Sequence, residues 1–456
     1  MKKLALALLL ALLLLAACGP AEQPDPADET EYEEEQPLLL SFYAVIDSWD
    51  GETLRVTDEQ GAERILQAGE AEICGDYPPE AGCPAEISVA EDGAADAALV
   101  LRVLAPPLEK TYIEQLMAGM TLEQEVGQMC LARCPELEAA EEAARLHLGG
   151  YVLFGRDFAG GTPETVRQDI ASYQQAADLP LFIAVDEEGG DVVRVSLYDA
   201  FRYVPFASQQ DLYAEGGLEA LAADAREKSA LLSGLGINVD LAPVADVSTD
   251  PGDFIYSRAL GQDAAVTADA VAVQVRELQQ GGVSATLKHF PGYGDNVDTH
   301  TGVAWDERPA SVFYEQDLLP FRAGIDAGAG FVLICHNIVA AFDESLPASL
   351  SPAVHDLLRQ ELGFEGLIIT DDLAMSGVAE LYGVEETAVL AVLAGNDMLL
   401  TSDPEAQIGA VLAACDSGRI SRETIDRAVE RILRSKIRAG LIELPEIDWA
   451  AYKQAQ

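Results

Sequence analysis

Basic side chains are scarce in this chain of 456 residues. Lysine and arginine number 28 against 78 aspartate and glutamate residues, which gives a formal net charge of −50. Because such a surface repels phosphate backbones, we expect no nucleic-acid partner. Histidine is rarer still, with five residues, and no spacing of cysteine and histidine suggests zinc. We therefore expect no metal and no other cofactor.

Long apolar runs are missing after the first twenty residues, so any membrane contact must come from the N-terminus. Residues 1–18 contain two lysines, a Leu/Ala stretch and Leu15-Ala16-Ala17-Cys18, a pattern typical of a secretory signal. Its last four residues resemble the bacterial lipobox, which predicts lipid attachment at Cys18 and anchoring to the outer face of the bacterial cell membrane. The alternative is an ordinary cleaved signal and a freely secreted protein.

Six further cysteines follow Cys18. Cys74 and Cys83 enclose a short loop that a disulfide would close readily, and two free thiols are equally compatible with the sequence. Cys130 and Cys134 lie in a predicted strand and at its end, where we expect buried free thiols.

Three segments flank or precede the main body of the chain. Residues 19–37 are acidic and proline-rich without lysine or arginine, which predicts a disordered tether. Residues 38–106 show short alternating runs with turns at Asp50-Gly51 and Gln60-Gly61, which predict a small all-β domain. This domain has no recognisable catalytic group, and wall binding and a spacer role are both open. Residues 446–456 form a C-terminal tail.

Residues 108–445 alternate apolar strands with helical stretches, the pattern of an α/β fold. A helix is expected at 166–177 after the capping residue Thr162. Eight strands wrapped by helices predict a (β/α)8 TIM-type barrel, with catalytic groups at the carboxyl ends of the strands. The predicted strands are 127–134, 150–154, 181–186, 237–247, 284–290, 331–336, 367–371 and 397–401.

Ionisable side chains gather where four of these strands end. They are Asp186 to Glu188, Lys288 and His289, His336, and Asp371 and Asp372. A carboxylate facing a proton donor across such a site is the minimum apparatus for cleaving a glycosidic bond through a covalent intermediate. Clustered carboxylates also bind divalent metals, so metal-assisted hydrolysis stays open at this point.

Several motifs in this region resemble the NagZ-type β-N-acetylhexosaminidases of glycoside hydrolase family 3. The resemblance runs from about residue 116 to residue 441 and keeps the family's motif order. The matching segments are 120–129, 186–190, 242–247, 257–258, 288–292, 298–300, 346–351 and 369–375.

The resemblance implies roles for individual residues. Asp371 would be the nucleophile and Asp372 a supporting residue, whereas His300 would protonate the leaving oxygen while Asp298 holds its imidazole. A carboxylate partner favours the protonated ring, so a histidine can donate a proton at neutral pH. The residues implied to bind the hydroxyls of the terminal sugar are Asp186, Arg194, Arg258, Lys288 and His289.

The chain departs from the family pattern at two positions and in one loop. Asp191 stands where the family commonly has arginine, and Tyr293 where it has histidine. The loop before Asp298 is also one residue shorter, which bears on the geometry of the acid/base pair and on the preference for the leaving group.

The resemblance implies a retaining exo-β-N-acetylglucosaminidase acting on an oligosaccharide or muropeptide. We expect a monomer whose one membrane contact is the lipid anchor. The alternatives are a family 3 β-glucosidase or β-glycoside phosphorylase and, from another class, a non-catalytic sugar-binding lipoprotein.

Overall fold

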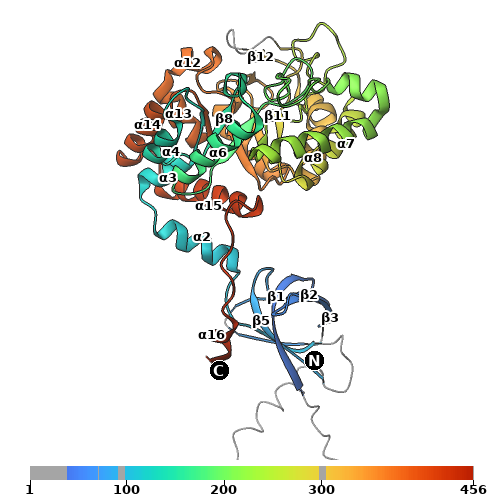
Figure 1. Ribbon diagram of the computed structural model, residues 1–456, viewed down its shortest axis with the longest axis vertical. Helices are drawn as coiled ribbons and strands as arrows, with labels where there is room; N and C mark the ends of the chain where they lie inside the picture. The colour runs from blue at the N-terminus through green and yellow to red at the C-terminus, as the bar shows by residue number, and fades with distance from the viewer. Residues whose placement is uncertain (1–38, 70, 76, 91–97, 297–303, 455–456) are drawn as a thin grey trace, which may run out of the picture.

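The computed structural model describes residues 39–69, 71–75, 77–90, 98–296 and 304–454. Figure 1 shows a large helix-covered barrel and a small β-domain, joined by α2 (Leu108–Ala118) and by the C-terminal segment that runs back to the β-domain. The predicted signal, Cys18, the tether and the pair Asp298 and His300 lie outside the described residues. No helix in the described part of the chain is long and apolar enough to cross a bilayer.

The small β-domain is one six-stranded sheet in the order β3-β2-β1-β5-β6-β4, as the alternating pattern predicts. All neighbours are antiparallel except β4 and β6. Gly51 and Gly61 have positive φ in the two expected turns, a conformation that glycine adopts without steric cost. The strands are β1 (Leu39–Trp49), β2 (Thr53–Asp58), β3 (Glu63–Gln67), β4 (Glu72–Gly75), β5 (Pro84–Ala90) and β6 (Ala98–Val103).

Eight parallel strands form the barrel in the order β15-β13-β11-β10-β9-β8-β7-β16. A bridge between Ile369 and Met398 connects β15 to β16 and nearly closes the ring. The predicted α/β barrel is therefore confirmed. The strands are β7 (Cys130–Arg133), β8 (Gly150–Leu153), β9 (Phe182–Val185), β10 (Val239–Asp240), β11 (Ser284–Phe290), β13 (Phe331–Ile334), β15 (Leu367–Thr370) and β16 (Leu399–Thr401).

Most of these strands are shorter than expected. Gly127 and Gln128 belong to a helix instead of a strand. The Thr121 side chain caps the start of α3 (Leu122–Gln128), and the helix continues through both residues. The segment 237–247 contributes two paired residues and one further bridge at Val244, since it includes Pro243, which has no N–H to donate to a ladder.

Helices pack around the barrel, and the one predicted from Thr162 is confirmed as α6 (Pro163–Ala176), whose cap is the Thr162 hydroxyl. The other helices of eight or more residues are α4 (Ala139–Leu146), α7 (Gln209–Leu235, interrupted at Gly216 and Gly217), α8 (Ala264–Gln280), α10 (Leu318–Asp326), α13 (Val384–Ala394), α14 (Pro404–Asp416) and α15 (Arg422–Arg438). The shorter elements are α5 (Gly155–Phe158), β12 (Trp305–Asp306), α9 (Ala310–Val312), η1 (Phe313–Asp317), β14 (Ile338–Val339), η2 (Ala348–Leu350), α11 (Pro352–Asp356), η3 (Leu357–Glu361), α12 (Ser376–Tyr382) and α16 (Trp449–Gln454).

The core of the barrel is apolar and tightly packed. Phe182 and Phe331 meet edge to face, with ring centroids 5.1 Å apart, and each buried side chain of this size stabilises the fold by about 1.5–3 kcal/mol. Cys130 and Cys134 are buried free thiols, as expected, and burial raises the pKa of each to about 12. Cys74 and Cys83 are also free thiols, so the disulfide that the sequence left open is not formed.

The C-terminal segment is more ordered than a simple tail. It ends in α16, which lies against the β-domain (Figure 1). The Trp449 ring is 5.9 Å from that of Tyr43, and Lys453 Nζ is 2.5 Å from a carboxylate oxygen of Glu59. The chain therefore leaves the β-domain through α2 and returns to it through α16.

Candidate active site

The candidate site lies at the carboxyl ends of the barrel strands, where the sequence placed it. Asp186 follows β9 directly, Lys288 and His289 are in the last three residues of β11, and Asp371 follows β15. The ladder between β11 and β13 shifts register between Leu287 and Phe290. Lys288 and His289 therefore lie in an irregularity of that ladder near the carboxyl end of β11, and Lys288 forms a bridge with Val244 on the other side.

Lys288 is the centre of a cluster of opposite charges. Its Nζ lies 2.7 Å from Asp186 Oδ1 and 2.6 Å from Glu188 Oε1. Arg258 grips the same Glu188 carboxylate in bidentate fashion, at 3.0 Å through Nε and 2.6 Å through Nη2. Bidentate guanidinium pairs fix orientation as well as charge, so these four side chains hold one another in place.

The cluster is ionised because its charges compensate the cost of burial. Burial alone raises the pKa of Glu188, but Lys288 and Arg258 outweigh it and lower the pKa to about 2. Burial likewise lowers the pKa of Lys288, and the carboxylates of Asp186 and Glu188 raise it above its ordinary value. Both groups are therefore charged at neutral pH, which gives the site fixed charged donors and acceptors.

His289 is oriented by two partners. Its Nδ1 lies 2.7 Å from Asp246 Oδ2, and Arg258 Nη2 lies 3.2 Å from its Nε2. Because the guanidinium has donors and no acceptors, Nε2 must accept, and we assign the ring proton to Nδ1. His289 thus joins Arg258 to the loop after β10, where Asp246 also accepts a hydrogen bond from the backbone N–H of Tyr293.

Glu187 shapes the loop that carries the predicted sugar-binding residue Arg194. Its buried carboxylate accepts hydrogen bonds from the backbone N–H groups of Arg194, Val195 and Ser196. The Arg194 guanidinium lies over the Phe154 ring, 6.0 Å from its centroid. Among the described residues, no hydrogen bond or ion pair joins Arg194 to the Lys288 cluster, and its guanidinium contacts the ring that follows β8.

Asp371 and Asp372 form the turn after β15. Asp371 Oδ1 accepts a hydrogen bond of 2.8 Å from the backbone N–H of Asp372. Asp372 accepts from the Ser402 hydroxyl at 2.6 Å, and its carbonyl oxygen accepts from His336 Nε2 at 3.1 Å. Asp372 and His336 therefore support the turn that presents Asp371, and Asp371 itself is partly exposed.

Asp298 and His300, the predicted acid/base pair, lie outside the described residues, between Asn296 and Ala304. Tyr293, which replaces the family's histidine, is buried, and its ring packs 5.6 Å from that of His289. Asp191, the other departure, is exposed.

The sequence did not assign the partners of two residues of this site, Glu188 and Asp246. Each lies in a motif, but neither pattern nor spacing tells that Glu188 bridges two cations or that Asp246 binds the His289 ring. Glu188 belongs to the strand-end carboxylates for which the sequence also leaves metal binding open. Its carboxylate is engaged by Lys288 and Arg258, and no group of three or more potential metal ligands exists among the described residues.

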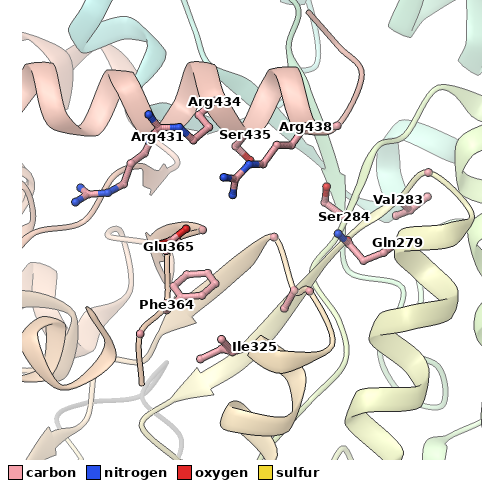
Figure 2. Close-up of a pocket in the computed structure, with 17 residues that line it drawn as sticks. Gln279, Val283, Ser284, Ile325, Phe364, Glu365, Arg431, Arg434, Ser435 and Arg438 are labelled. Atoms are coloured by element: carbon pink, nitrogen blue, oxygen red, sulfur yellow. The ribbon is translucent and has the colours of Figure 1, made fainter. Parts of the chain in front are cut away.

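A cavity of about 380 Å³ lies at the opposite end of the barrel, and Figure 2 shows it between α15 and the turns that precede three strands. Its wall includes Arg431 and Arg434. Arg431 pairs with Asp397 at 3.1 Å, and Arg434 with Glu109 and Glu430 at 2.9 and 2.7 Å. The Asp397 pair ties α15 to the segment before β16, the Glu109 pair ties α15 to α2, and the Glu430 pair lies within α15.

A parallel barrel whose strand ends present a carboxylate together with a buried cluster of opposite charges has the make-up of a glycosidase. The family model described as the glycosyl hydrolase family 3 N terminal domain matches residues 121–435. The chain belongs to glycosyl hydrolase family 3.

Named relatives agree with this assignment. A "Beta-hexosaminidase" of Xanthomonas campestris pv. campestris is 33% identical over 321 residues, which are 69% of this chain and 91% of that protein. One from Stenotrophomonas maltophilia is 37% identical over 59% of this chain and 81% of its own length. The structure of a family 3 β-N-acetylglucosaminidase from Paenibacillus sp. is 36% identical with a TM-score of 0.67, and the match covers 73% of this chain and 65% of that one.

Proposed function

We propose that this protein is a retaining exo-β-N-acetylglucosaminidase that removes terminal β-linked N-acetylglucosamine from peptidoglycan fragments or related oligosaccharides. The observation that carries the proposal is the clamp of Asp186, Glu188, Arg258 and Lys288 on the same barrel face as Asp371. A closed charged clamp on the hydroxyls of one terminal sugar fits exo cleavage. The β-hexosaminidase relatives supply the sugar class.

The reaction divides into two displacements. Asp371 attacks the anomeric carbon while protonated His300 gives its proton to the leaving oxygen, so the glycosidic bond breaks as the ester bond to Asp371 forms. Neutral His300 then takes a proton from water, whose oxygen displaces Asp371 and restores the original anomeric configuration. Asp298 stabilises the imidazolium in the first step. The clamp fixes the ring for attack, which lowers the entropic part of the barrier.

The same proposal includes the location of the enzyme in the cell. Lipid attachment at Cys18 would hold a monomeric enzyme at the outer face of the cell membrane, within reach of wall fragments. Incorporation of labelled fatty acid into the expressed protein tests it, since Cys18→Ser should abolish labelling. Labelling that persists in that variant would contradict the anchor.

An aryl glycoside panel tests the activity. We expect release of the aryl alcohol from the N-acetyl-β-glucosaminide, much less from the β-glucoside, and a first product of β configuration by NMR. Turnover that requires phosphate would identify a phosphorylase instead. A β-glucoside preference would identify a β-glucosidase, and no turnover of either substrate between about pH 4 and 8 would favour the sugar-binding lipoprotein.

A further inference from the structure

Both ends of the acid/base loop meet at one arginine, Arg308. The segment that carries Asp298 and His300 leaves the described chain after Asn296 and returns at Ala304. Asn296 Nδ2 on the incoming side donates to Asp306 Oδ2 on the outgoing side at 3.0 Å. Asp306 in turn is bound by Arg308, so the loop is closed at its base by side chains of its own two flanks.

Arg308 joins two buried carboxylates. Its Nε and Nη2 lie 3.0 and 2.8 Å from Asp306 oxygens, and its Nη1 lies 3.2 Å from both oxygens of Asp317. Asp306 and Asp317 are 2% and 1% exposed. Asp317 ends the π-helix η1, which leads into α10. The planar guanidinium has five N–H donors and can bind both carboxylates at once, whereas the ammonium group of a lysine cannot reproduce this geometry.

Two glycines bring the incoming strand of the loop directly onto this cluster. A side chain at Gly294 would collide with the Arg308 guanidinium, and one at Gly292 would collide with the Asp317 carboxylate. Both glycines have positive φ. The backbone from Gly292 to Asn296 therefore follows the surface of the Arg308–Asp317 pair, which sets the direction in which the chain enters the loop.

The cluster also connects to the sugar clamp. The Tyr293 carbonyl accepts a hydrogen bond of 2.8 Å from Asn296, while the Tyr293 N–H donates to Asp246 at 2.7 Å. Asp246 holds His289, which contacts Arg258. The base of the loop and the groups proposed to bind the terminal sugar thus form one continuous network.

We propose that Arg308 is a positioning residue for general acid/base catalysis, because it sets where the loop bearing Asp298 and His300 begins and ends. The proposal rests on the function proposed above. Proton transfer requires heavy atoms within about 2.6–3.2 Å, and a misplacement of about 1 Å can cost about 100-fold in rate.

Leaving-group dependence separates positioning from a purely structural role. A substrate with a good leaving group needs little protonation, whereas a poor one depends on the acid. We expect Arg308→Lys to lower kcat/KM about 100-fold more for an alkyl N-acetyl-β-glucosaminide than for the dinitrophenyl glycoside, with KM nearly unchanged. Asn296→Ala removes the contact between the two flanks and should show the same pattern, more weakly. Asn296→Ala also tests the proposal if the Arg308→Lys variant does not fold.

Arg359→Lys is the matched control. Arg359 also grips a buried carboxylate, that of Asp397, but at the amino-terminal end of the barrel. It should lower the melting temperature and keep the wild-type ratio between the two substrates. Equal losses on both substrates in Arg308→Lys and Asn296→Ala would overturn the positioning role. His300→Ala must itself lose more on the alkyl glycoside, and if it does not, the proposed acid fails independently of Arg308.

Discussion

Single residues decide the chemistry of this site, and Asp371 is the first test of it. Asp371→Ala removes the group proposed to attack the anomeric carbon, and the adjacent Asp372 carboxylate is held by the Ser402 hydroxyl. We expect kcat for the aryl N-acetyl-β-glucosaminide to fall by at least about 10⁴-fold. Asp372→Asn is the comparison, since its side-chain oxygen can still accept the Ser402 hydrogen bond, and it should retain measurable turnover. Full activity in Asp371→Ala would refute the assignment.

Glu188 makes a second prediction at the same scale. Glu188→Gln leaves Lys288 and Arg258 sharing one fewer negative charge in a buried site, so we expect a lower kcat/KM and reduced stability. The lowered pKa of about 2 means that ionised Glu188 stabilises the fold above about pH 4.5 and that this contribution is lost as the pH falls toward 2. Urea unfolding from pH 6 to 3 should therefore depend less on pH in Glu188→Gln. Identical pH slopes in both proteins would contradict it.

The stability that Asp240 contributes depends on pH in the opposite direction. Asp240 is fully buried, one oxygen accepts the Glu187 N–H, and burial raises its pKa to about 8. The unfolded chain ionises near pH 3.8 while the folded protein keeps the proton, so stability from this group is full below pH 3.8 and is lost as the pH rises to 8. Asp240→Asn should therefore gain stability relative to wild type between pH 4 and 8, by up to about 1.4 kcal/mol per pH unit. A constant difference across that range would disprove the raised pKa.

The sequence predicts which strand ends carry charged side chains, but it does not predict which of these side chains contact one another. The sequence predicts that Asp186 and Lys288 bind hydroxyls, and the structure pairs the two side chains, whereas the described contact of the Arg194 guanidinium is with Phe154. Glu188 and Asp246 could not be assigned because their roles depend on partners 70 and 43 positions away in the chain. Pattern and spacing describe neighbours in sequence, and these contacts exist only after the barrel closes.

At the scale of elements, close backbone approach limits which residues the barrel tolerates. Gly149 precedes β8, and a Cβ at this position would clash with the Gln128 carbonyl oxygen and with Met398. Gly149→Ala should destabilise the barrel by several kcal/mol or prevent folding, as seen in thermal melts. Gly409→Ala is the control because nothing lies within 4 Å of its Cβ in the middle of α14. It should stabilise the protein by up to about 1 kcal/mol.

The eight strands and helix α6 were predictable because apolar β-branched runs and a capping threonine are local signals. Strand ends were less predictable. Pairing stops where Pro243 or a polar strand end interrupts the ladder, and that depends on the neighbouring strand. Helix α16 was missed, since its six residues pack on Tyr43 and Glu59, more than 390 positions earlier in the chain.

At the scale of the whole molecule, the return of the C-terminal segment to the β-domain adds a second connection between that domain and the barrel. Removing residues 446–456 deletes the contacts of Trp449 with Tyr43 and of Lys453 with Glu59. We expect wild-type kcat/KM from the barrel but faster hydrogen exchange in residues 39–67. Equal exchange in both proteins would show that α2 alone holds the β-domain.

The proposed covalent glycosyl–Asp371 intermediate is tested most directly by mass spectrometry. In His300→Ala, an activated aryl N-acetyl-β-glucosaminide can still glycosylate the enzyme, but the group that activates water is missing, so the intermediate should accumulate. We predict one N-acetylglucosamine on the peptide that contains Asp371, and none when Asp371→Ala is added. An adduct on another residue, or one that persists without Asp371, would contradict the account.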